Sequence, residues 1–348
     1  MKQGRTLQEL AMELDRQAKQ KQDFVADTRQ LEVVPSGDRL KINGIGDFGI
    51  APLAHRQIGE RLNIPARYYD RMKENAPDLL SANVNHWFKK VPENRMLRTL
   101  DGNTRAFLSD RYRRLDNFDL MEAILPTLGQ IPGLQVASCE VTEHRLYLKA
   151  VTEKITADVR KGDPVQAGIV ISNSEVGLGS FSVEPMIYIL SCLNGMIAPA
   201  YGMKKYHIGR KIGAEETARQ LFTDETLKAD DKAFWLKARD IVQGAFSQDI
   251  FNQLVNEMRE AGQKEITGNP VKAVEQLANH FQLSNSETDG IMTHLIKNGD
   301  LTQLGLSHAV TRASQDLDSY DRATELERLG HDVITLRPDV WKVIGEAA

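Results

Sequence analysis

Hydrophobic residues recur every three or four positions through much of residues 1–90, and this spacing predicts amphipathic helices. Two short extended runs with a Pro-Ser-Gly-Asp turn between them predict a hairpin. Proline ends one helical pattern at Asn63-Ile64-Pro65, because its ring cannot continue the backbone ladder. The predicted helices are 6–22, 52–62, 66–75 and 77–89, and the extended runs are 31–34 and 39–42. We therefore expect residues 1–90 to form a helical N-terminal region with a small hairpin.

Strand patterns dominate residues 91–213. Leu146, Leu148 and Ala150 alternate with Arg145, Tyr147 and Lys149, which predicts a strand with one face buried and one face in water. A helix is also expected over 185–196, opened by Pro185 and ended near Asn194-Gly195. The other predicted strands are 104–109, 134–141, 166–172, 180–183 and 206–212, and another helix is predicted at 118–128. We expect these residues to form the strand-rich central core.

From residue 214 to residue 348 the hydrophobic spacing is helical almost throughout. Ser284 with Glu287 fits the capping box that opens a helix, and Gly299 fits a helix stop. The clearest helical ranges are 214–221, 230–243, 249–261, 270–281, 284–298 and 306–316. A strand-rich centre followed by a helical tail indicates an α+β fold, with a central antiparallel sheet, packed helices and a mostly helical C-terminal domain over 214–348.

Composition is that of an ordinary folded protein, with 348 residues, 41% hydrophobic and 26% charged. This length suggests about two domains. Two cysteines, Cys139 and Cys192, are too few for a disulfide framework, which favours a reducing compartment. The N-terminus lacks the apolar core of a signal peptide, and the apolar stretch 186–200 is interrupted by polar residues. We therefore expect a cytoplasmic protein with no membrane partner.

Charge is distributed unevenly along the chain. Residues 1–213 carry 30 Lys and Arg against 25 Asp and Glu, a balance of +5, and residues 214–348 carry 14 against 23, a balance of −9. Such asymmetry is typical of a protein whose one half meets a polyanion, and it also arises by chance on solvated surfaces. The asymmetry alone does not decide between these explanations.

The first candidate binding segment surrounds the sequence Ser-Asp-Arg-Tyr-Arg-Arg at 109–114. Guanidinium groups grip phosphate in a bidentate manner, and a tyrosine ring stacks on a base. The candidate residues for nucleic-acid binding here are Arg105, Arg111, Tyr112, Arg113 and Arg114. The alternative is structural, because these arginines could pair with the nearby carboxylates of Asp110, Asp116, Asp119 and Glu122 and fix the corner between strand and helix.

The second candidate segment follows the predicted strands. Between residues 201 and 213 there are four positive residues and no acid, interleaved with aromatic rings. This composition suits contact with a single strand, where cations follow the backbone and rings stack on bases. The candidates are Lys204, Lys205, Tyr206, Arg210 and Lys211, and Trp87 is a further ring that could stack on a base or belong to a core. The alternative for this segment is a solvated linker between domains.

The sequence shows no motif for enzyme chemistry. Residues 172–179 read Ser-Asn-Ser-Glu-Val-Gly-Leu-Gly, which predicts a tight turn, since the glycine spacing is wrong for a phosphate-binding loop. No HExxH motif, acid-rich metal run or activated cysteine is recognisable. We expect no catalytic residue, no metal site and no cofactor.

Six stretches of the sequence form a specific combination. They are Leu-Asn-Ile-Pro-Ala-Arg-Tyr-Tyr at 62–69, Phe-Leu-Ser-Asp-Arg-Tyr-Arg-Arg-Leu-Asp-Asn at 107–117, Ser-Asn-Ser-Glu-Val-Gly at 172–177, Ser-Cys-Leu-Asn-Gly-Met at 191–196, Gly-Leu-Ser-His-Ala-Val-Thr at 305–311 and Tyr-Asp-Arg-Ala-Thr-Glu-Leu-Glu at 320–327. Together, between about residue 50 and residue 335, they resemble the phage/plasmid-like protein family filed as domain of unknown function 932. The resemblance implies a gene carried by phages, prophages and plasmids, and therefore a bacterial cell or a phage-infected host as its location. It implies no established activity.

Three hypotheses for the function follow. The first is a protein that binds or anneals single-stranded nucleic acid in the replication or recombination of a mobile element, because the order of elements is similar to that in the core of phage single-strand annealing proteins; that similarity also implies a homo-oligomer. The second is a structural or virion-associated protein that assembles without nucleic acid. The third is a nucleic-acid-processing enzyme whose catalytic groups converge only in the fold.

Overall fold

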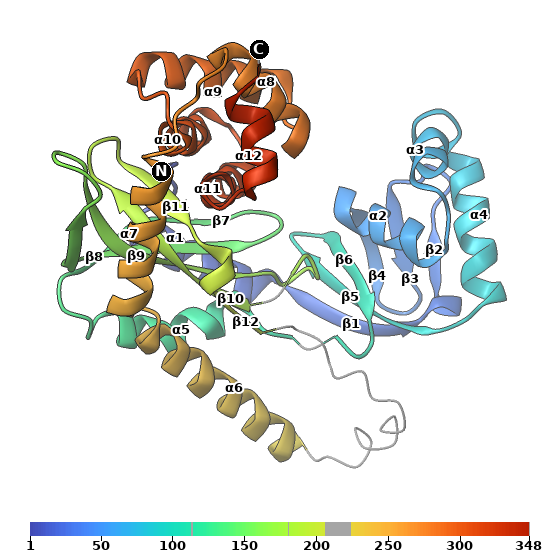
Figure 1. Ribbon diagram of the computed structural model, residues 1–348. Coiled ribbons are helices and arrows are strands. Elements are labelled where there is room, and N and C mark those ends of the chain that lie inside the picture. The colour runs from blue at the N-terminus through green and yellow to red at the C-terminus, as the bar shows by residue number, and fades with distance from the viewer. Residues whose placement is uncertain (113, 180, 206–223, 348) are drawn as a thin grey trace.

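The computed structural model describes residues 1–112, 114–179, 181–205 and 224–347, and it has the α+β fold predicted from the sequence (Figure 1). Two sheets lie side by side, and helices pack against each of them. The last part of the chain is helical. The segments predicted at 206–212 and 214–221 lie outside the described residues. No helix in the described part of the chain is long and apolar enough to cross a membrane.

The N-terminal sheet has the strand order β1-β5-β6-β4-β3-β2, and its pairs are antiparallel except for β4 with β6. The helices on one face bury side chains such as Ile58 and Phe88 against Leu97 and Phe107. The strands are β1 (Gln22–Asp27), β2 (Leu31–Val33), β3 (Arg39–Ile42), β4 (Gly46–Ile50), β5 (Asn94–Leu100) and β6 (Asn103–Ser109), and the helices are α2 (Pro52–Arg61), α3 (Ala66–Asn75) and α4 (Pro77–Lys90). The sequence predicted a boundary between regions at residue 90. Strands β5 and β6 follow this residue, yet they pair with strands β1 and β4, which precede it.

The central sheet is antiparallel throughout, as predicted, with the order β11-β10-β9-β8-β7 and with β12 paired to β10. Helices cover both of its faces, so that the sheet lies in the middle of three layers (Figure 1). The strands are β7 (Leu134–Val141), β8 (Leu146–Asp158), β9 (Pro164–Asn173), β10 (Phe181–Ile189), β11 (Asn194–Ile197) and β12 (Met203–Lys205). One face packs against α1 (Leu7–Gln20), α5 (Asn117–Leu128), α6 (Asp224–Gly244) and α7 (Gln248–Ala261), and the other against α11 (Tyr320–Ile334). Helix α10 (Gln303–Ala313) contacts the edge strand β11, where Asn194 donates to the His308 carbonyl.

The predicted half-buried character of β8 is wrong. Leu146, Leu148 and Ala150 face the core formed with α1 and α5, as expected, but Tyr147 and Lys149 on the opposite face are buried as well. Helix α11 covers that face, and the Lys149 ammonium donates to the Glu327 carboxylate at 2.6 Å. A cation paired in this way can occupy a buried position, which the alternation of polar and apolar residues does not reveal.

The predicted helix over 185–196 is also wrong, because these residues form the hairpin of β10 and β11. A short apolar run buried on both faces of a sheet has the same composition as a buried helix. Pro185 lies where the neighbour of β10 changes, since β12 pairs as far as Val183 and β11 pairs from Met186. Its carbonyl still accepts from the Ala198 N–H at 2.9 Å. Proline is therefore tolerated in this strand because its missing N–H falls between two partner strands.

The remaining helices, α8 (Pro270–Phe281), α9 (Asn285–Asn298) and α12 (Pro338–Gly345), pack with α10 and α11 around a separate apolar cluster. The predicted capping box is confirmed: the Glu287 N–H donates to Ser284 Oγ at 3.3 Å, and the Ser284 N–H donates to Glu287 Oε2 at 2.8 Å. Gly299 ends α9 with a φ of 70°, as predicted. The C-terminal region is thus mostly helical.

Candidate nucleic-acid interface

The first basic segment forms the corner between β6 and α5. The strand ends at Ser109, and a tight turn follows in which the Tyr112 N–H donates to the Ser109 carbonyl at 2.9 Å. The Arg111 N–H also donates to Ser109 Oγ at 3.2 Å. Arg111 is exposed at this turn. The local bonds explain why a polar Ser-Asp-Arg sequence ends the strand here.

Arg105 lies away from solvent on β6, where its guanidinium forms an ion pair with the carboxylate of Glu175. Their side chains are only 14% and 5% exposed. Glu175 belongs to the loop between β9 and β10, and its other carboxylate oxygen accepts the Asn117 N–H at the start of α5, at 2.6 Å. A carboxylate at this position satisfies a free donor of the helix and interacts favourably with the helix dipole. Glu175 therefore ties Arg105 to the first turn of α5.

A second buried arginine, Arg98 on β5, lies at the centre of the same cluster. Its Nε donates to Asp23 Oδ1 at 2.9 Å, its Nη2 donates to Asp116 Oδ1 at 2.5 Å, and its Nη1 donates to the Glu175 carbonyl at 3.0 Å. The Arg98 side chain is 0% exposed. Lys21 reaches Asp116 Oδ2 from the other side at 2.6 Å. These contacts join the N-terminal sheet, the β9–β10 loop and α5 at one point.

The charges in the cluster compensate one another. Burial by itself would raise the pKa of Asp116, but the positive charges of Arg98 and Lys21 outweigh burial and lower this pKa to about 2. Burial opposes the charge on Arg98, and the surrounding carboxylates still raise the pKa of its guanidinium. Asp116 is thus ionised, and Arg98 is protonated, at neutral pH. We name this group of residues the junction cluster: Lys21, Asp23, Arg98, Arg105, Asp116 and Glu175.

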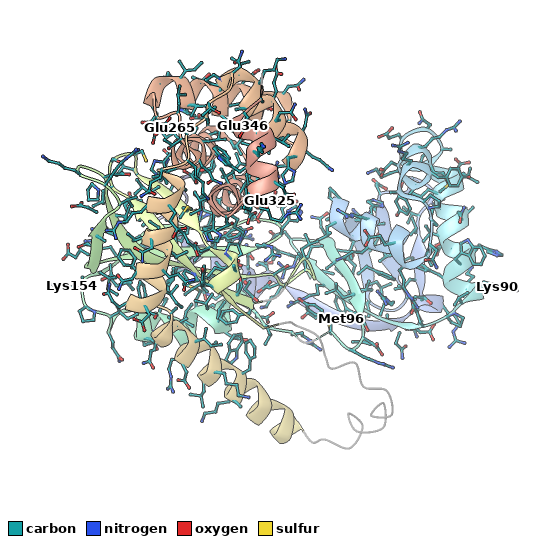
Figure 2. The ribbon with its side chains drawn as sticks, viewed as in Figure 1. Lys90, Met96, Lys154, Glu265, Glu325 and Glu346 are labelled. Atoms are coloured by element: carbon teal, nitrogen blue, oxygen red, sulfur yellow. The ribbon has the colours of Figure 1, made fainter. Side chains whose placement is uncertain are left out.

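Tyr112 packs against the apolar side of the junction. Its ring lies against the cluster that contains Met96, Leu108 and Val176, and its hydroxyl donates to the Ser174 carbonyl at 2.9 Å. Burial raises the pKa of this hydroxyl to about 12. Met96, labelled in Figure 2, lies on the side of β5 that carries Arg98. The ring of Tyr112 is therefore held in a packed position.

The other arginines of the segment are more exposed. The Arg114 side chain is 52% exposed, with Nη1 at 3.8 Å from Asp23 Oδ2, and Arg111 is exposed at the turn. A long, exposed ion pair of this kind contributes little to stability. Arg113 lies outside the described residues. Arg111 and Arg114 are thus the described cations of this segment that face solvent.

The second basic segment begins at the same end of the central sheet. Ser172 pairs with Ser182, and Ser182 pairs with Lys204, so three backbones form one row across β9, β10 and β12 (Figure 1). Since neighbouring strands lie ~4.8 Å apart, the Cα of Lys204 is about 10 Å from that of Ser172. Asn173, next to Ser172, donates from Nδ2 to the Leu115 carbonyl at 2.8 Å. The two basic segments therefore lie at the same end of the central sheet.

Of the second segment, Lys204 and Lys205 lie in the part of the chain that the structure describes. Lys205 is located through its backbone, which pairs with Phe181, whereas Tyr206, Arg210 and Lys211 lie outside the described residues. Trp87, the additional aromatic candidate, is 41% exposed on α4, where its ring makes an edge contact with His86. Figure 1 shows α4 on the outer side of the N-terminal region, away from β12.

The sequence did not single out Lys21, Asp23 and Arg98. Each is an isolated charged residue in its own segment, and their partners are distant; Asp23 and Arg98 are 75 positions apart in the sequence. The turn predicted at 172–179 begins later in the structure, because Ser172 and Asn173 still belong to β9. In the loop that follows, Gly177 has a φ of 82°, and a Cβ there would meet Leu108 Cδ2 at 2.6 Å. Glycine is needed at Gly177 because the loop is left-handed where it touches the N-terminal sheet.

Neither cysteine is an activated thiol. Burial raises the pKa of Cys139 to about 11, and its Sγ donates to the Arg5 carbonyl at 3.2 Å. Burial also raises the pKa of Cys192. Among the described residues no group of three or more His, Cys, Asp and Glu side chains could hold a metal ion. The junction cluster itself pairs carboxylates with guanidinium and ammonium groups.

A scan against protein-family models and searches of curated proteins and of solved structures found no match to this chain. The resemblance to the phage/plasmid-like family stays a prediction, carried by the stretches quoted above.

Proposed function

We propose that this chain binds single-stranded nucleic acid along the edge where its two basic segments meet, and that it acts in the replication or recombination of a phage or plasmid. One observation carries the proposal: the row Ser172–Ser182–Lys204 and the bond from Asn173 to Leu115 bring both segments to the same end of the central sheet. Cations that lie along one edge of the protein can follow successive phosphates of one strand.

The residues proposed to contact nucleic acid are not all of the candidates that the sequence suggests. Arg105 is neutralised by Glu175, and Tyr112 is packed against Leu108, so in the proposed function both support the corner between β6 and α5. Tyr206 would stack on a base. The proposed phosphate contacts are Arg111, Arg113, Arg114, Lys204, Lys205, Arg210 and Lys211.

A salt titration of binding to a fluorescent oligothymidylate tests the proposal. Each phosphate neutralised on a single strand contributes a slope of about −0.7 to a plot of log affinity against log salt, so seven contacts predict a slope of about −5. Absence of binding even at low salt would overturn the proposal and favour an assembly protein that does not use nucleic acid. Cleavage of the labelled strand after addition of Mg²⁺ would instead favour a nucleic-acid-processing enzyme.

A charge-matched pair of variants separates a local site from general attraction. The variant Arg111→Gln, Arg113→Gln, Arg114→Gln is expected to reduce the magnitude of the slope by about 2. The control removes three cations from the outer helices α3 and α4 through Arg67→Gln, Arg71→Gln and Lys90→Gln, and is expected to leave the slope unchanged; Lys90 is labelled in Figure 2. Equal effects of the two variants would contradict a site at this edge.

A further inference from the structure

A polar hollow lies at the other end of the central sheet, away from the proposed interface. It has a volume of about 480 Å³ and opens between four parts of the chain. The β8–β9 loop and the β10–β11 turn form its sides on the sheet, and the ends of α9 and α10 form the rest. Its size falls within the range of about 300–1,000 Å³ that is usual for small-molecule sites.

The lining of the hollow is strongly basic. Four cations face it, Arg160, Lys161, Lys297 and Arg312, against a single lining carboxylate, that of Asp163. Arg160 is paired with Asp300, and Arg312 donates to the side chain of Gln315. Within the part of the chain that the structure describes, neither Lys161 nor Lys297 has a carboxylate within 4 Å. The cations at the rim therefore create a positive potential that attracts an anion.

The floor of the hollow contains two buried polar atoms without a partner among the described residues, His308 Nε2 and Asp163 Oδ2. These residues are 6% and 8% exposed. The other oxygen of Asp163 accepts from Ser191 Oγ at 2.9 Å. A buried polar group without a partner is costly, and a well-formed protein leaves few of them. Their position in the lining of the hollow indicates that a bound molecule completes both bonds.

The chemistry of these groups narrows the class of ligand. Burial lowers the pKa of His308, although Asp163 and Asp300 oppose this shift and Arg160 adds to it, so the ring is neutral at pH 7 and its Nε2 can donate or accept one hydrogen bond. The Asp163 carboxylate accepts only. A ligand that suits the floor thus supplies hydroxyl or amine hydrogens, whereas the basic rim favours a phosphate. Inorganic phosphate alone would leave the floor incomplete.

We propose that this hollow binds a small phosphate monoester on a hydroxylated scaffold, as in a nucleoside monophosphate or a sugar phosphate. The phosphate lies between Lys161 and Lys297 at the rim, and hydroxyl groups of the scaffold reach Asp163 Oδ2 and His308 Nε2 at the floor. This site does not depend on the proposed binding of nucleic acid, since it uses different residues at the opposite end of the strands.

Isothermal titration calorimetry with AMP, ribose 5-phosphate, adenosine and inorganic phosphate tests the site. AMP or ribose 5-phosphate is expected to bind with a dissociation constant below about 1 mM, and adenosine and inorganic phosphate are expected to bind at least tenfold more weakly, a difference of about 1.4 kcal/mol. No binding of either phosphate ester overturns the proposal. Inorganic phosphate that binds as tightly as the esters overturns the role of the floor.

Two variants with the same change in charge localise the site. Lys161→Ala with Lys297→Ala is expected to weaken ester binding by about tenfold or more. Lys154→Ala with Lys342→Ala, at two exposed positions outside the lining, is the control and is expected to bind as the wild type does; Lys154 is labelled in Figure 2. Equal weakening in both variants would mean that the esters are attracted to the protein surface in general.

An NMR measurement on the wild-type protein tests contact of the ligand with the floor. In the wild-type protein, addition of ribose 5-phosphate is expected to shift the imidazole resonances of His308, while those of His86 on α4 stay in place. His308→Gln assigns the signal and is expected to weaken binding of the ester. Binding that leaves the His308 resonances unchanged would contradict contact with the floor.

Discussion

Arg98 holds the two sheets together in this structure, and its replacement tests that role. Arg98→Met keeps an unbranched aliphatic side chain but removes the donors to Asp23, to Asp116 and to the Glu175 carbonyl. Breaking a buried ion pair from one side costs about 3–5 kcal/mol, because the remaining charge stays buried without its partner. Lys21 still reaches Asp116 in the variant, which favours the lower end of this range.

The pH dependence of stability gives a second measure of the contact between Arg98 and Asp116. The pKa of Asp116 falls from 3.8 to about 2 in the folded protein, which corresponds to about 2 kcal/mol of stability. Because the folded pKa is lowered, this contribution is fully present above about pH 4 and is lost as the pH falls through about 2. Without Arg98 the burial of Asp116 is less compensated and its pKa rises. We therefore expect the deficit of Arg98→Met to shrink as the pH falls below about 4.

Urea unfolding followed by circular dichroism at neutral pH and at about pH 3 measures both effects. Arg39→Met is the matched control in the same sheet, since the pair of Arg39 with Asp47 at 3.1 Å is about half exposed and is expected to contribute less than about 1 kcal/mol. The double variant Arg98→Met, Asp116→Asn is expected to be more stable than Arg98→Met alone. A loss below about 1 kcal/mol in Arg98→Met, or a deficit that does not change with pH, would refute the reasoning.

Three further predictions concern other buried groups. Glu327→Leu leaves the Lys149 ammonium buried without its carboxylate and is expected to cost about 3–5 kcal/mol in urea unfolding, whereas Lys149→Met with Glu327→Leu is expected to recover most of this loss. Tyr112→Phe removes the donor to the Ser174 carbonyl and is expected to cost about 1 kcal/mol with unchanged affinity for oligothymidylate; weaker binding at unchanged stability would instead indicate that the ring stacks on a base. Cys139, whose pKa burial raises to about 11, is expected to resist iodoacetamide at neutral pH until the protein unfolds, as peptide mass spectrometry can show.

Local sequence predicted those elements whose ends are fixed by local bonds. The predicted range of α3, Ala66–Asn75, agrees with the structure, because Pro65 sets its start and its apolar residues repeat at helical spacing. The capping box of Ser284 with Glu287 marks the start of α9 within four residues of sequence. The alternation of Leu146 and Leu148 likewise identified β8 and one of its buried faces.

Distant contacts decided what the sequence could not show. The run after Pro185 became a strand because β9 and β11 pair with it on its two sides, and a single apolar run does not carry that information. The same holds for the candidate site. Exposed Arg111 and Arg114 could be named from local composition, but the pairing of Arg105 depends on Glu175, 70 residues away. Burial of Arg98 depends on Asp23 and Asp116 from separate elements.

Photo-crosslinking to a single-stranded oligonucleotide that carries 4-thiothymidine tests the central claim most directly. Peptides from both basic segments, 109–117 and 203–213, are expected to carry the crosslinked base. The row through Ser182 and the bond from Asn173 to Leu115 place both segments at the same end of the central sheet. Peptides from α3 and α4, which lie on the outer side of the N-terminal region, are expected to carry none. Crosslinks to only one of the two segments, or mainly to α3 and α4, would contradict a shared nucleic-acid interface.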